Sequence, residues 1–588
     1  MGIEVWLLVA GVVMAAWAYS RWRHSYWSSR GVSTPPYLPF LGHMHKLLSS
    51  SQSRWLYFDE VYQKFGGSTL SGLYELFRPV LMIGDPELLK NIFVKDFDHF
   101  VDRRKFLAEE GSISNIMLSN MTGDEWKTLR GIMSPTFTSG KMRSMFPLIC
   151  EKADALVSFS LKEAANKPFV DMKVNFARFT MDTIASCAFG IECNSFKSEV
   201  PEFSKYAEMF FNFPFLRIIK ITLFNIFPKI GNALGIKIDS PAIGFFSNVV
   251  EETIAARNTG QRRGDYLDLL LDARADVNHP IITDTSTVPH NQSTTTQDRT
   301  AQETIITDTS TVPHNQSTTT QDRTAQETII TDTSTVPHNQ STTTQDQTAQ
   351  ETINHDSSVT NVNNIPIAQS KQVLTNKSIV AQSVLFLVAG YETTAATLAF
   401  LSFQLAKHPI HQQRLREEIK QIIHEYGDIT YQGIMEAKLL DACLMETLRL
   451  YPPATFGERK CTRTYKIPGT EVTLHPGDLV TVPFWSLHHD PRYWPEPEEF
   501  QPDRFLPENK PNITSFTHMP FGMGPRNCIA MRFALMEAKV ALAKLLIAAE
   551  MHLDKNHTEL KMDNSLLFMR PDEGVNLVIT PIPSNTHG

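Results

Sequence analysis

The chain has 588 residues, 42% of them hydrophobic, which is enough for one large core or two packed subdomains. The formal net charge is −8, so no overall basic surface favours binding to nucleic acid. The six cysteines are widely spaced and form neither a zinc-type CxxC pair nor a disulfide framework. Their even number leaves pairing open, but we expect five of the six to be free and mostly buried thiols.

The amino terminus carries an apolar run that approaches the thickness of a bilayer. Residues 2–19 contain a single charge, at Glu4. At about 1.5 Å per helical residue, such a segment nearly spans a hydrocarbon core of roughly 30 Å. Residues 1–20 are therefore predicted to form a membrane anchor. The basic and proline-rich residues 21–42 are predicted to form a stiff, extended tether, because proline fixes φ and discourages helix.

The charges on either side of the apolar run predict its orientation. No lysine or arginine precedes it, whereas Arg21, Arg23 and Arg30 follow it. Because basic flanks stay on the cytosolic side, the rest of the chain is expected to face the cytosol. A cleaved signal peptide is the alternative, since the Ala-Trp-Ala sequence at 16–18 resembles a cleavage site. The missing basic residue before the run favours an uncleaved signal anchor.

The hydrophobic pattern of the body predicts a mainly helical protein. Residues 68–83 are rich in β-branched and aromatic residues and are broken by glycine and proline, which predicts a strand, a turn and a second strand. Helical patterns dominate from about residue 122 to 275. Further helices are predicted at 376–406, 409–425 and 432–451, and strands return over 470–484. The expected fold class is mainly α with a minor β part (α+β).

Three 24-residue copies, nearly identical in sequence, interrupt the helical region at residues 281–352. Each copy is rich in Thr, Ser and Gln and cannot bury much apolar surface, which also excludes a solenoid. We expect a disordered surface insert between helices, because lengthening a loop costs little closure entropy. Each copy carries an Asn-Gln-Ser glycosylation sequon that would face the cytosol and stay unmodified.

One predicted apolar helix, SVLFLVAGYETTAATLAF at 383–400, contains small and polar residues in its middle. Gly390 costs about 1 kcal/mol there relative to alanine and usually has a packing reason. The Thr393 hydroxyl is expected to bond to the carbonyl of Ala389, which loosens the helix locally. A shallow groove beside this hydroxyl and the Glu392 carboxylate would result. Ordinary helix packing, with Glu392 at a surface, explains the motif alone equally well.

A second motif, METLRLYPP, places Glu446 and Arg449 at i and i+3 on one helical face, where they can pair. Leucines and a methionine flank them, which predicts burial, and a buried ion pair needs further hydrogen bonds. Arg504, within FQPDRF at 500–505, is expected to complete a network of three residues. Alone, an ExxR pattern is a weak signal.

The third motif is FGMGPRNCIA at 521–530, just before a long apolar helix. A helix N-terminus, backbone N–H groups and cationic neighbours all stabilise a thiolate, and Cys528 stands where a helix begins. Gly522 and Gly524 allow a sharp turn and a close approach, and Arg526 can meet an anion. Taken alone, this loop allows either a nucleophile or a metal ligand.

Together and in this order, the motifs resemble those of the cytochrome P450 superfamily. FGMGPRNCIA is similar to its heme-binding loop FxxGxRxCxG, AGYETT to its oxygen-activation groove, ETLR with FQPDRF to its ExxR network, and WKTLR at 126–130 to its WxxxR segment. The resemblance covers nearly the whole chain outside the repeats. It is closest to the microsomal branch of vertebrate drug-oxidising and insect detoxifying enzymes. It implies one heme-thiolate catalytic domain, made of residues 43–280 and 353–588.

The resemblance also implies a role for individual residues. Cys528 would be the axial thiolate ligand of the iron of heme b. The heme would further be held by Arg526, Trp126, Arg130, Arg459, Arg103 and Phe521. Thr393 and Glu392 would guide protons to the oxygen-binding side, where Ala389 and Gly390 leave room. The substrate pocket would be lined by Ser119, Leu385, Val388, Ala454, Thr455 and Leu567. The last glycine of the heme loop is replaced by Ala530, whose methyl group would crowd the heme slightly.

The implied reaction inserts one atom of O2 into a lipophilic substrate, which is a xenobiotic, a hormone or a fatty acid. Electrons would come from NADPH through a flavoprotein reductase, since the chain shows no flavin or nicotinamide domain, and cytochrome b5 is a further candidate donor. The protein would lie in the endoplasmic reticulum membrane as a single-pass signal anchor with its catalytic domain in the cytosol. The alternative is a heme-thiolate isomerase or dehydratase that rearranges peroxides without a reductase. The acid–threonine pair of Glu392 and Thr393 favours monooxygenation.

Overall fold

The structure is a computed structural model that describes residues 3–47, 53–105, 111–198, 201–211, 220–221, 224, 231, 233–234, 239–260, 262–278, 374–563 and 568–583. The three repeats and the predicted pocket residue Leu567 lie outside the described residues. The predictions made for them therefore remain predictions.

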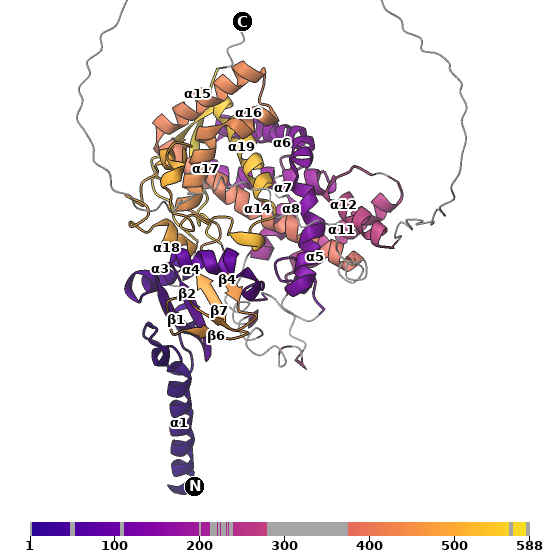
Figure 1. Ribbon diagram of the computed structural model, residues 1–588. Coiled ribbons are helices and arrows are strands. Elements are labelled where there is room, and N and C mark those ends of the chain that lie inside the picture. The colour runs from indigo at the N-terminus through magenta and orange to yellow at the C-terminus, as the bar shows by residue number, and fades with distance from the viewer. Residues whose placement is uncertain are drawn as a thin grey trace, which may run out of the picture. The chain divides into compact units, whose positions relative to one another are not determined.

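Helices make up most of the described chain, as the hydrophobic pattern predicts (Figure 1). The α-helices are α1 (Ile3–His24), α2 (Met44–Leu47), α3 (Arg54–Lys64), α4 (Pro86–Lys90), α5 (Gly123–Met133), α6 (Ser139–Asn166), α7 (Met172–Ile184), α8 (Glu202–Phe211), α11 (Pro241–Asn258), α12 (Tyr266–Asn278), α14 (Asn376–Lys407), α15 (Pro409–Tyr426), α16 (Tyr431–Glu436), α17 (Lys438–Leu450), α18 (Phe484–His488) and α19 (Met531–Ala548).

Short strands form the minor β part. The strands are β1 (Leu70–Glu75), β2 (Arg78–Ile83), β3 (Val170–Asp171), β4 (Gly457–Lys460), β5 (Tyr465–Lys466), β6 (Thr473–Leu474), β7 (Leu479–Val482), β8 (Ala549–Leu553) and β9 (Asn576–Pro581). The largest sheet has the order β1-β2-β7-β4, and β2 and β7 are parallel whereas the other pairs are antiparallel. The predicted strand–turn–strand at 68–83 is confirmed. The sheet joins the early part of the chain to segments nearly 400 residues later, with Val80 opposite Leu479.

One predicted helix, at 432–451, is two helices in the structure. The backbone of Ala437 is extended, with φ −64° and ψ 96°, and separates α16 from α17. The carboxylate of Glu418 on α15 accepts the free N–H groups of Leu439 and Leu440 at 2.8 and 3.0 Å. A side chain from another helix therefore caps the first turn of α17, which the hydrophobic period of the segment does not reveal.

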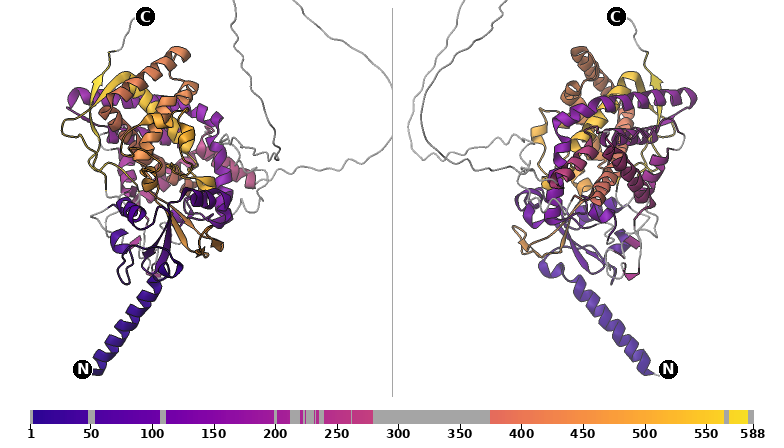
Figure 2. Two further views of the ribbon diagram at one scale, coloured as in Figure 1. Left: turned by 60° about the vertical axis from the view of Figure 1, so that its left-hand side comes forward. Right: turned by 90° about the vertical axis from the view of Figure 1, so that its right-hand side faces the viewer.

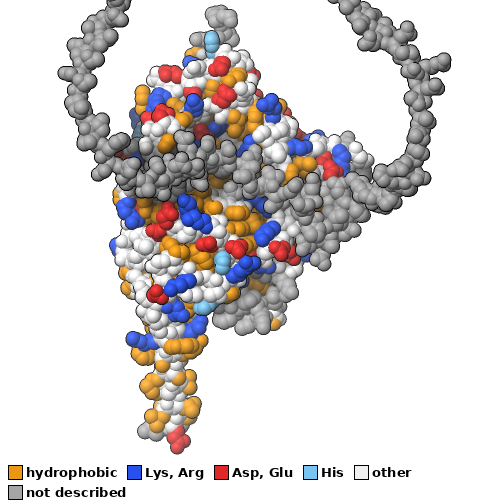
Figure 3. Space-filling model, viewed as in Figure 1, with side chains coloured by type: hydrophobic (Ala, Val, Ile, Leu, Met, Phe, Trp, Pro, Cys, Tyr) orange, Lys and Arg blue, Asp and Glu red, His pale blue; other side chains and the backbone are white. Residues whose placement is uncertain are grey.

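Two helices in the described part of the chain are long and apolar enough to cross a bilayer, and their burial distinguishes them. The most apolar window of α14 is 72% buried, and this helix packs against α7, α11, α17 and α19 in the main hydrophobic core. The window at the amino terminus is only 6% buried. Figure 3 shows hydrophobic side chains along the length of α1 and basic ones where it meets the rest of the protein. Helix α1 thus has the composition of a membrane anchor, and α14 is a core helix.

The segment after the anchor differs from the predicted free tether. Helix α1 continues to His24, four residues past the predicted boundary at residue 20. The indole of Trp27 is buried against β1, where its Nε1 donates to the carbonyl of Leu73 at 3.0 Å. A side chain at Gly72 would collide with this indole, so glycine is required there. The first part of residues 21–42 is therefore packed onto the sheet, and α1 leads away from it (Figure 2).

Candidate active site

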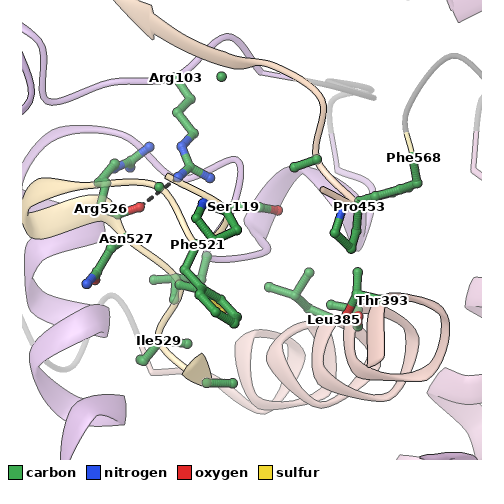
Figure 4. Close-up of a pocket in the computed structure, with 18 of the residues that line it drawn as sticks. Arg103, Ser119, Leu385, Thr393, Pro453, Phe521, Arg526, Asn527, Ile529 and Phe568 are labelled. Carbon is green, nitrogen blue, oxygen red and sulfur yellow. Dashed lines mark hydrogen bonds between the residues drawn. The ribbon is translucent and has the colours of Figure 1, made fainter. Parts of the chain in front are cut away.

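The Cys528 loop opens onto a large cavity of about 1020 Å³. Its walls come from α5, α14, α19, β4 and the loop itself, so segments more than 400 residues apart meet there. Among the residues predicted for the site, those that line the cavity are Arg103, Ser119, Trp126, Arg130, Leu385, Ala389, Gly390, Thr393, Ala454, Arg459, Phe521, Arg526 and Cys528. Figure 4 shows Phe521, Leu385 and Thr393 around this space, with Arg103 and Arg526 on one side.

Two glycines shape the Cys528 loop. Gly522 and Gly524 both have left-handed backbones, with φ 68° and 70°. A Cβ atom on Gly524 would overlap the carbonyl oxygen of Phe93, so the loop approaches its neighbour too closely for any side chain there. The N–H of Cys528 then donates to the carbonyl of Phe521 at 2.8 Å. The turn directs the cysteine to the cavity just before α19 begins.

Cys528 differs from the other five cysteines. It is the only one of the six whose side chain is exposed, and it is exposed to the cavity. Burial raises the pKa of the Cys528 thiol. The N–H of Ala530 and the positive charges of Arg130 and Arg103 act in the opposite direction. Burial also raises the pKa values of the other five thiols. Among the six, Cys528 alone is exposed to the cavity and has two arginines, Arg103 and Arg130, that favour the thiolate, which is the form that binds metals.

Four of the arginines that line the cavity lie around the Cys528 loop and lack a carboxylate partner. Arg103, Arg130, Arg459 and Arg526 form no ion pair with the described residues, and they donate instead to backbone carbonyls or to an amide oxygen. Burial lowers the pKa of each, to about 10 for Arg130 and about 9 for Arg526, and repulsion from neighbouring guanidinium groups adds to the effect for Arg130, Arg459 and Arg526. Four buried arginines without ion-pair partners can neutralise a group with two negative charges that binds beside the Cys528 thiol.

Aromatic rings orient two of these arginines. The guanidinium of Arg526 lies over Trp126, 4.3 Å from the ring centroid, and that of Arg459 lies over Phe93 at 4.5 Å. Trp126 and Arg130 share one face of α5, as their spacing predicts. Cation–π contact therefore holds the guanidinium groups in place without neutralising their charge.

The predicted groove lies on one face of α14. The hydroxyl of Thr393 donates to the carbonyl of Ala389 at 2.8 Å, as expected, and that of Thr397 donates to the carbonyl of Thr393 at the same distance. A side chain at Gly390 would overlap Ile184 of α7, so this glycine permits close helix packing. The predicted groove and ordinary helix packing therefore both apply to this motif. Its small residues leave room on the cavity face of α14 and let α7 pack closely.

Glu392 lies neither beside the groove nor at a surface, the two positions predicted for it. Its carboxylate does not line the cavity, and it lies 3.3 Å from the ammonium of Lys173 on α7. The side chain is 1% exposed, so it is not at a surface either. Successive helical residues are rotated by about 100°, and the face of α14 that carries Thr393 therefore directs Glu392 towards α7.

Two predicted pocket residues also lie elsewhere. Val388 is buried in the main core, away from the cavity face of α14. Thr455 is also buried, and its carbonyl accepts a hydrogen bond from the N–H of Trp485. Neither lines the cavity. Pro453 and Phe568 do line it, next to Ala454 and to the predicted Leu567 (Figure 4). The predictions identified the correct segments but not always the residue that faces inward.

The ExxR residues form a network away from the cavity. Glu446 and Arg449 are both fully buried and are joined by two hydrogen bonds of 2.8 and 2.9 Å. Arg504 approaches the same carboxylate at 3.5 Å, as predicted. Arg449 also donates to the carbonyls of His488, Pro497 and Glu499, which ties α17 to the segment that leads to the Cys528 loop.

Comparison with known proteins agrees with this geometry. The family model for cytochrome P450 matches residues 32–299 and 323–579. The chain belongs to the cytochrome P450 family. It is 33% identical over 570 residues to Cytochrome P450 9e2 of Blattella germanica, and the aligned region covers 93% of this chain and 92% of that relative. It is 31% identical to Cytochrome P450 3A41 of Mus musculus and to Cytochrome P450 3A5 of Homo sapiens, with 93% of this chain and 90% of each relative covered.

Membership makes this P450 a heme-thiolate monooxygenase that uses heme b. The cavity fits that cofactor, because an accessible cysteine and four unpaired arginines can hold one iron and two propionate groups. Ala530 does not strain the loop, since its backbone at φ −95° is one that alanine adopts freely.

The P450 cavity also contains residues that the sequence patterns missed. Phe137, Phe386 and Tyr266 form a continuous aromatic stack, with ring centroids 5.4 and 4.5 Å apart along it. Phe386 lies in the same helix as the predicted groove, so the helical period of that segment could have indicated that Phe386 faces the cavity. Glu537 on α19 lines the cavity as well, and its apolar surroundings in the sequence predict only a buried helix position.

Proposed function

We propose that this protein hydroxylates or otherwise oxygenates lipophilic small molecules at the endoplasmic reticulum membrane. Electrons would come from NADPH through a separate flavoprotein reductase. The observation that carries the proposal is the single accessible thiol, Cys528, at the end of a large cavity beside four arginines that lack anionic partners.

In this proposal Cys528 ligates the iron, and Arg103, Arg130, Arg459 and Arg526 hold the propionates. When bound, heme supplies the activation of O2, which thiolate ligation favours by donating electron density to the iron. The protein's own contribution is to exclude bulk water, to fix the sulfur and to line the same cavity with the Thr393 hydroxyl. The N–H of Ala530 faces the sulfur and tunes its electron density.

The substrate side of the cavity indicates lipophilic substrates. Leu118, Leu385, Phe386 and Phe568 present apolar side chains, and Ser119 adds one small polar group. Concave apolar surfaces with few polar groups are typical of sites for hydrophobic ligands. Xenobiotics, hormones and fatty acids all fit this description, and the similarity to the relatives named above favours xenobiotics.

Proton supply is the second task of the residues on α14. Thr393 faces the cavity and its hydroxyl donates to the carbonyl of Ala389, so its lone pairs are left to accept a hydrogen bond from the cavity side. For Glu392 to take part, its carboxylate must leave Lys173 and rotate towards the cavity. We propose Thr393 as the residue that holds the proton and Glu392 as a donor that moves.

Helix α1 supports the proposed position at the membrane. Its exposed apolar length and the basic residues in its last turn suit a signal anchor with the catalytic domain in the cytosol. The reductase, and cytochrome b5 as a further donor, would then meet the protein at the same membrane.

The proposal is tested by reconstituting the full-length protein with heme, lipid and reductase. Substrate-dependent NADPH consumption and incorporation of one oxygen atom from labelled O2 into an alkoxycoumarin or another lipophilic probe are expected. Rearrangement of a lipid hydroperoxide without NADPH, together with no incorporation from O2, would instead assign the protein to the isomerase class.

A further inference from the structure

Glu537 is a buried acid that the mechanism above does not use. It lies on α19, nine residues after Cys528, and its side chain is fully buried. Neither of its carboxylate oxygens accepts a hydrogen bond from the described residues, and none of their lysines or arginines pairs with it. Burying a polar group without hydrogen-bond partners costs folding free energy, which points to a functional role for Glu537.

Two polar side chains interact with Glu537. The Thr394 hydroxyl of α14 faces the carboxyl, and the Cys187 thiol approaches from the segment at Ala185–Phe189. Both residues, like Glu537, line the cavity. Burial raises the pKa of Glu537 well above its usual range, and Thr394 only partly offsets the rise. Burial also raises the pKa of the Cys187 thiol.

Thr394 connects this acid to the groove. Thr393, Thr394 and Thr397 all line the cavity from one side of α14, and α14 packs directly against α19. Thr394 is 4% exposed, and its hydroxyl has both a donor and acceptor function. The Thr394 hydroxyl therefore stands between Glu537 and the groove that contains Thr393.

Glu392 offers a contrast on the other side of the same helix. Its carboxylate is paired with Lys173, and it does not line the cavity. Before it can supply a proton, this acid must break an ion pair and rotate. Glu537 needs no rotation, because it already faces both Thr394 and the cavity.

We propose that Glu537 is a positioning acid for oxygen chemistry, which stores a proton and passes it through Thr394 to the cavity. This inference rests on the proposed monooxygenase function. In the transfer, the O–H bond of Glu537 breaks and its proton moves to Oγ1 of Thr394, which releases its own hydroxyl proton into the cavity. The Glu537 carboxylate then recovers one proton from solvent water that enters the cavity between turnovers. The net change is one proton moved from solvent to the cavity.

The first test measures the protonation of Glu537 without any turnover. Infrared difference spectra of the ferric full-length protein, wild type minus Glu537→Gln, should show the carbonyl stretch of a protonated carboxylic acid that shifts in heavy water. The matched control is Glu417→Gln, an exposed acid on α15, which should show no such band. A carboxylate band in place of the acid band would mean that Glu537 is ionised at rest, and would overturn the proposal.

The second test measures proton delivery. With reductase and an alkoxycoumarin, Glu537→Gln should form about 100-fold less product at saturating substrate, with KM little changed, because a positioned acid typically contributes 10²–10⁴-fold. Turnover supported by cumene hydroperoxide, which bypasses the NADPH-driven protonation, should remain within about twofold of wild type. Equal losses in both reactions would show a merely structural role and would overturn the proposal.

A second variant covers the case in which Glu537→Gln does not retain heme. Thr394→Val removes the hydroxyl but keeps the shape, so it should keep the acid band of Glu537 and should also lose NADPH-driven product. Unchanged product from Thr394→Val would contradict the relay. If the wild type itself lacks both NADPH- and hydroperoxide-supported turnover, the proposed function fails, whereas the infrared result still decides the state of Glu537.

Discussion

At the scale of single residues, Gly522 and Gly524 look equivalent in the sequence but have different surroundings. Both have left-handed backbones. A Cβ atom on Gly522 would find its nearest neighbour at 3.9 Å, at Asn527, whereas one on Gly524 would overlap the carbonyl of Phe93. The first glycine is required for its conformation alone, and the second also for close packing.

Replacing each of the two glycines separates these requirements. Gly522→Ala should lower the free energy of unfolding by about 1–2 kcal/mol, the cost of a left-handed alanine. Gly524→Ala should cost more and should reduce heme content, because the loop must move away from Phe93 and carries Cys528 with it. Chemical denaturation and the heme-to-protein ratio measure both effects. Equal losses in the two variants would mean that contact with Phe93 is unimportant.

Thr393 carries a prediction at the same scale. Thr393→Ala removes the only hydroxyl in the groove that is bonded to Ala389, so product formed per NADPH consumed should fall by about 100-fold. NADPH consumption should continue, with the oxygen released as peroxide. Thr393→Ser retains the hydroxyl and should stay close to wild type. Loss of product in the serine variant as well would indicate a packing role for the threonine methyl group.

At the scale of secondary-structure elements, the buried network of Glu446 and Arg449 decides whether α17 and the segment before the Cys528 loop stay together. Glu446 accepts from Arg449 and from the N–H of Gln501, and Arg449 reaches three carbonyls of the following segment. Removing one partner leaves the other charge buried and unpaired, which costs more than the pair itself contributes.

Glu446→Ala should therefore lower the free energy of unfolding by about 3–5 kcal/mol. The ion pair between Arg414 and Asp503, which is partly exposed, is the matched control: Arg414→Ala should cost only about 0–1 kcal/mol. Denaturant titration of the three proteins measures the difference. Similar losses in the two variants would show that burial of the network is not what makes it important.

The elements were more predictable than the side chains that face the cavity. Periodicity predicted α14 to within one residue, and β-branched composition predicted β1 and β2. It could not tell that Glu392 faces Lys173, because that depends on where α7 packs. The break at Ala437 was also missed, since it depends on Glu418 of another helix. Local patterns predict an element, whereas its neighbours determine which residues point inward.

At the scale of the whole molecule, the site joins segments that are far apart along the chain. Motifs in order could identify Cys528, Arg130 and Thr393 because each belongs to a recognisable local pattern. Glu537 belongs to no pattern, and only the packing of α19 against α14 shows it beside Thr394. The residues proposed to hold the heme could therefore be named from motifs, whereas the acid on α19 could not.

The repeats at 281–352 permit a prediction at this scale. They contain few aliphatic residues, and sequence reasoning assigns them to a surface insert. Deleting all three copies should change the free energy of unfolding by less than about 1 kcal/mol, since each doubling of loop length costs only about 0.6 kcal/mol. Denaturant titration and turnover of the deletion variant check this. A large loss of stability would show that the copies contribute packed structure.

The central claim is that Cys528 supplies a thiolate to heme iron. The most direct measurement is the absorption spectrum of the reduced protein with carbon monoxide. The wild type should show the long-wavelength Soret band of thiolate-ligated heme, and Cys528→His should retain heme but shift the band to the position of a histidine complex. The same spectrum from wild type and Cys528→His, or a wild-type band without the thiolate shift, would contradict the assignment.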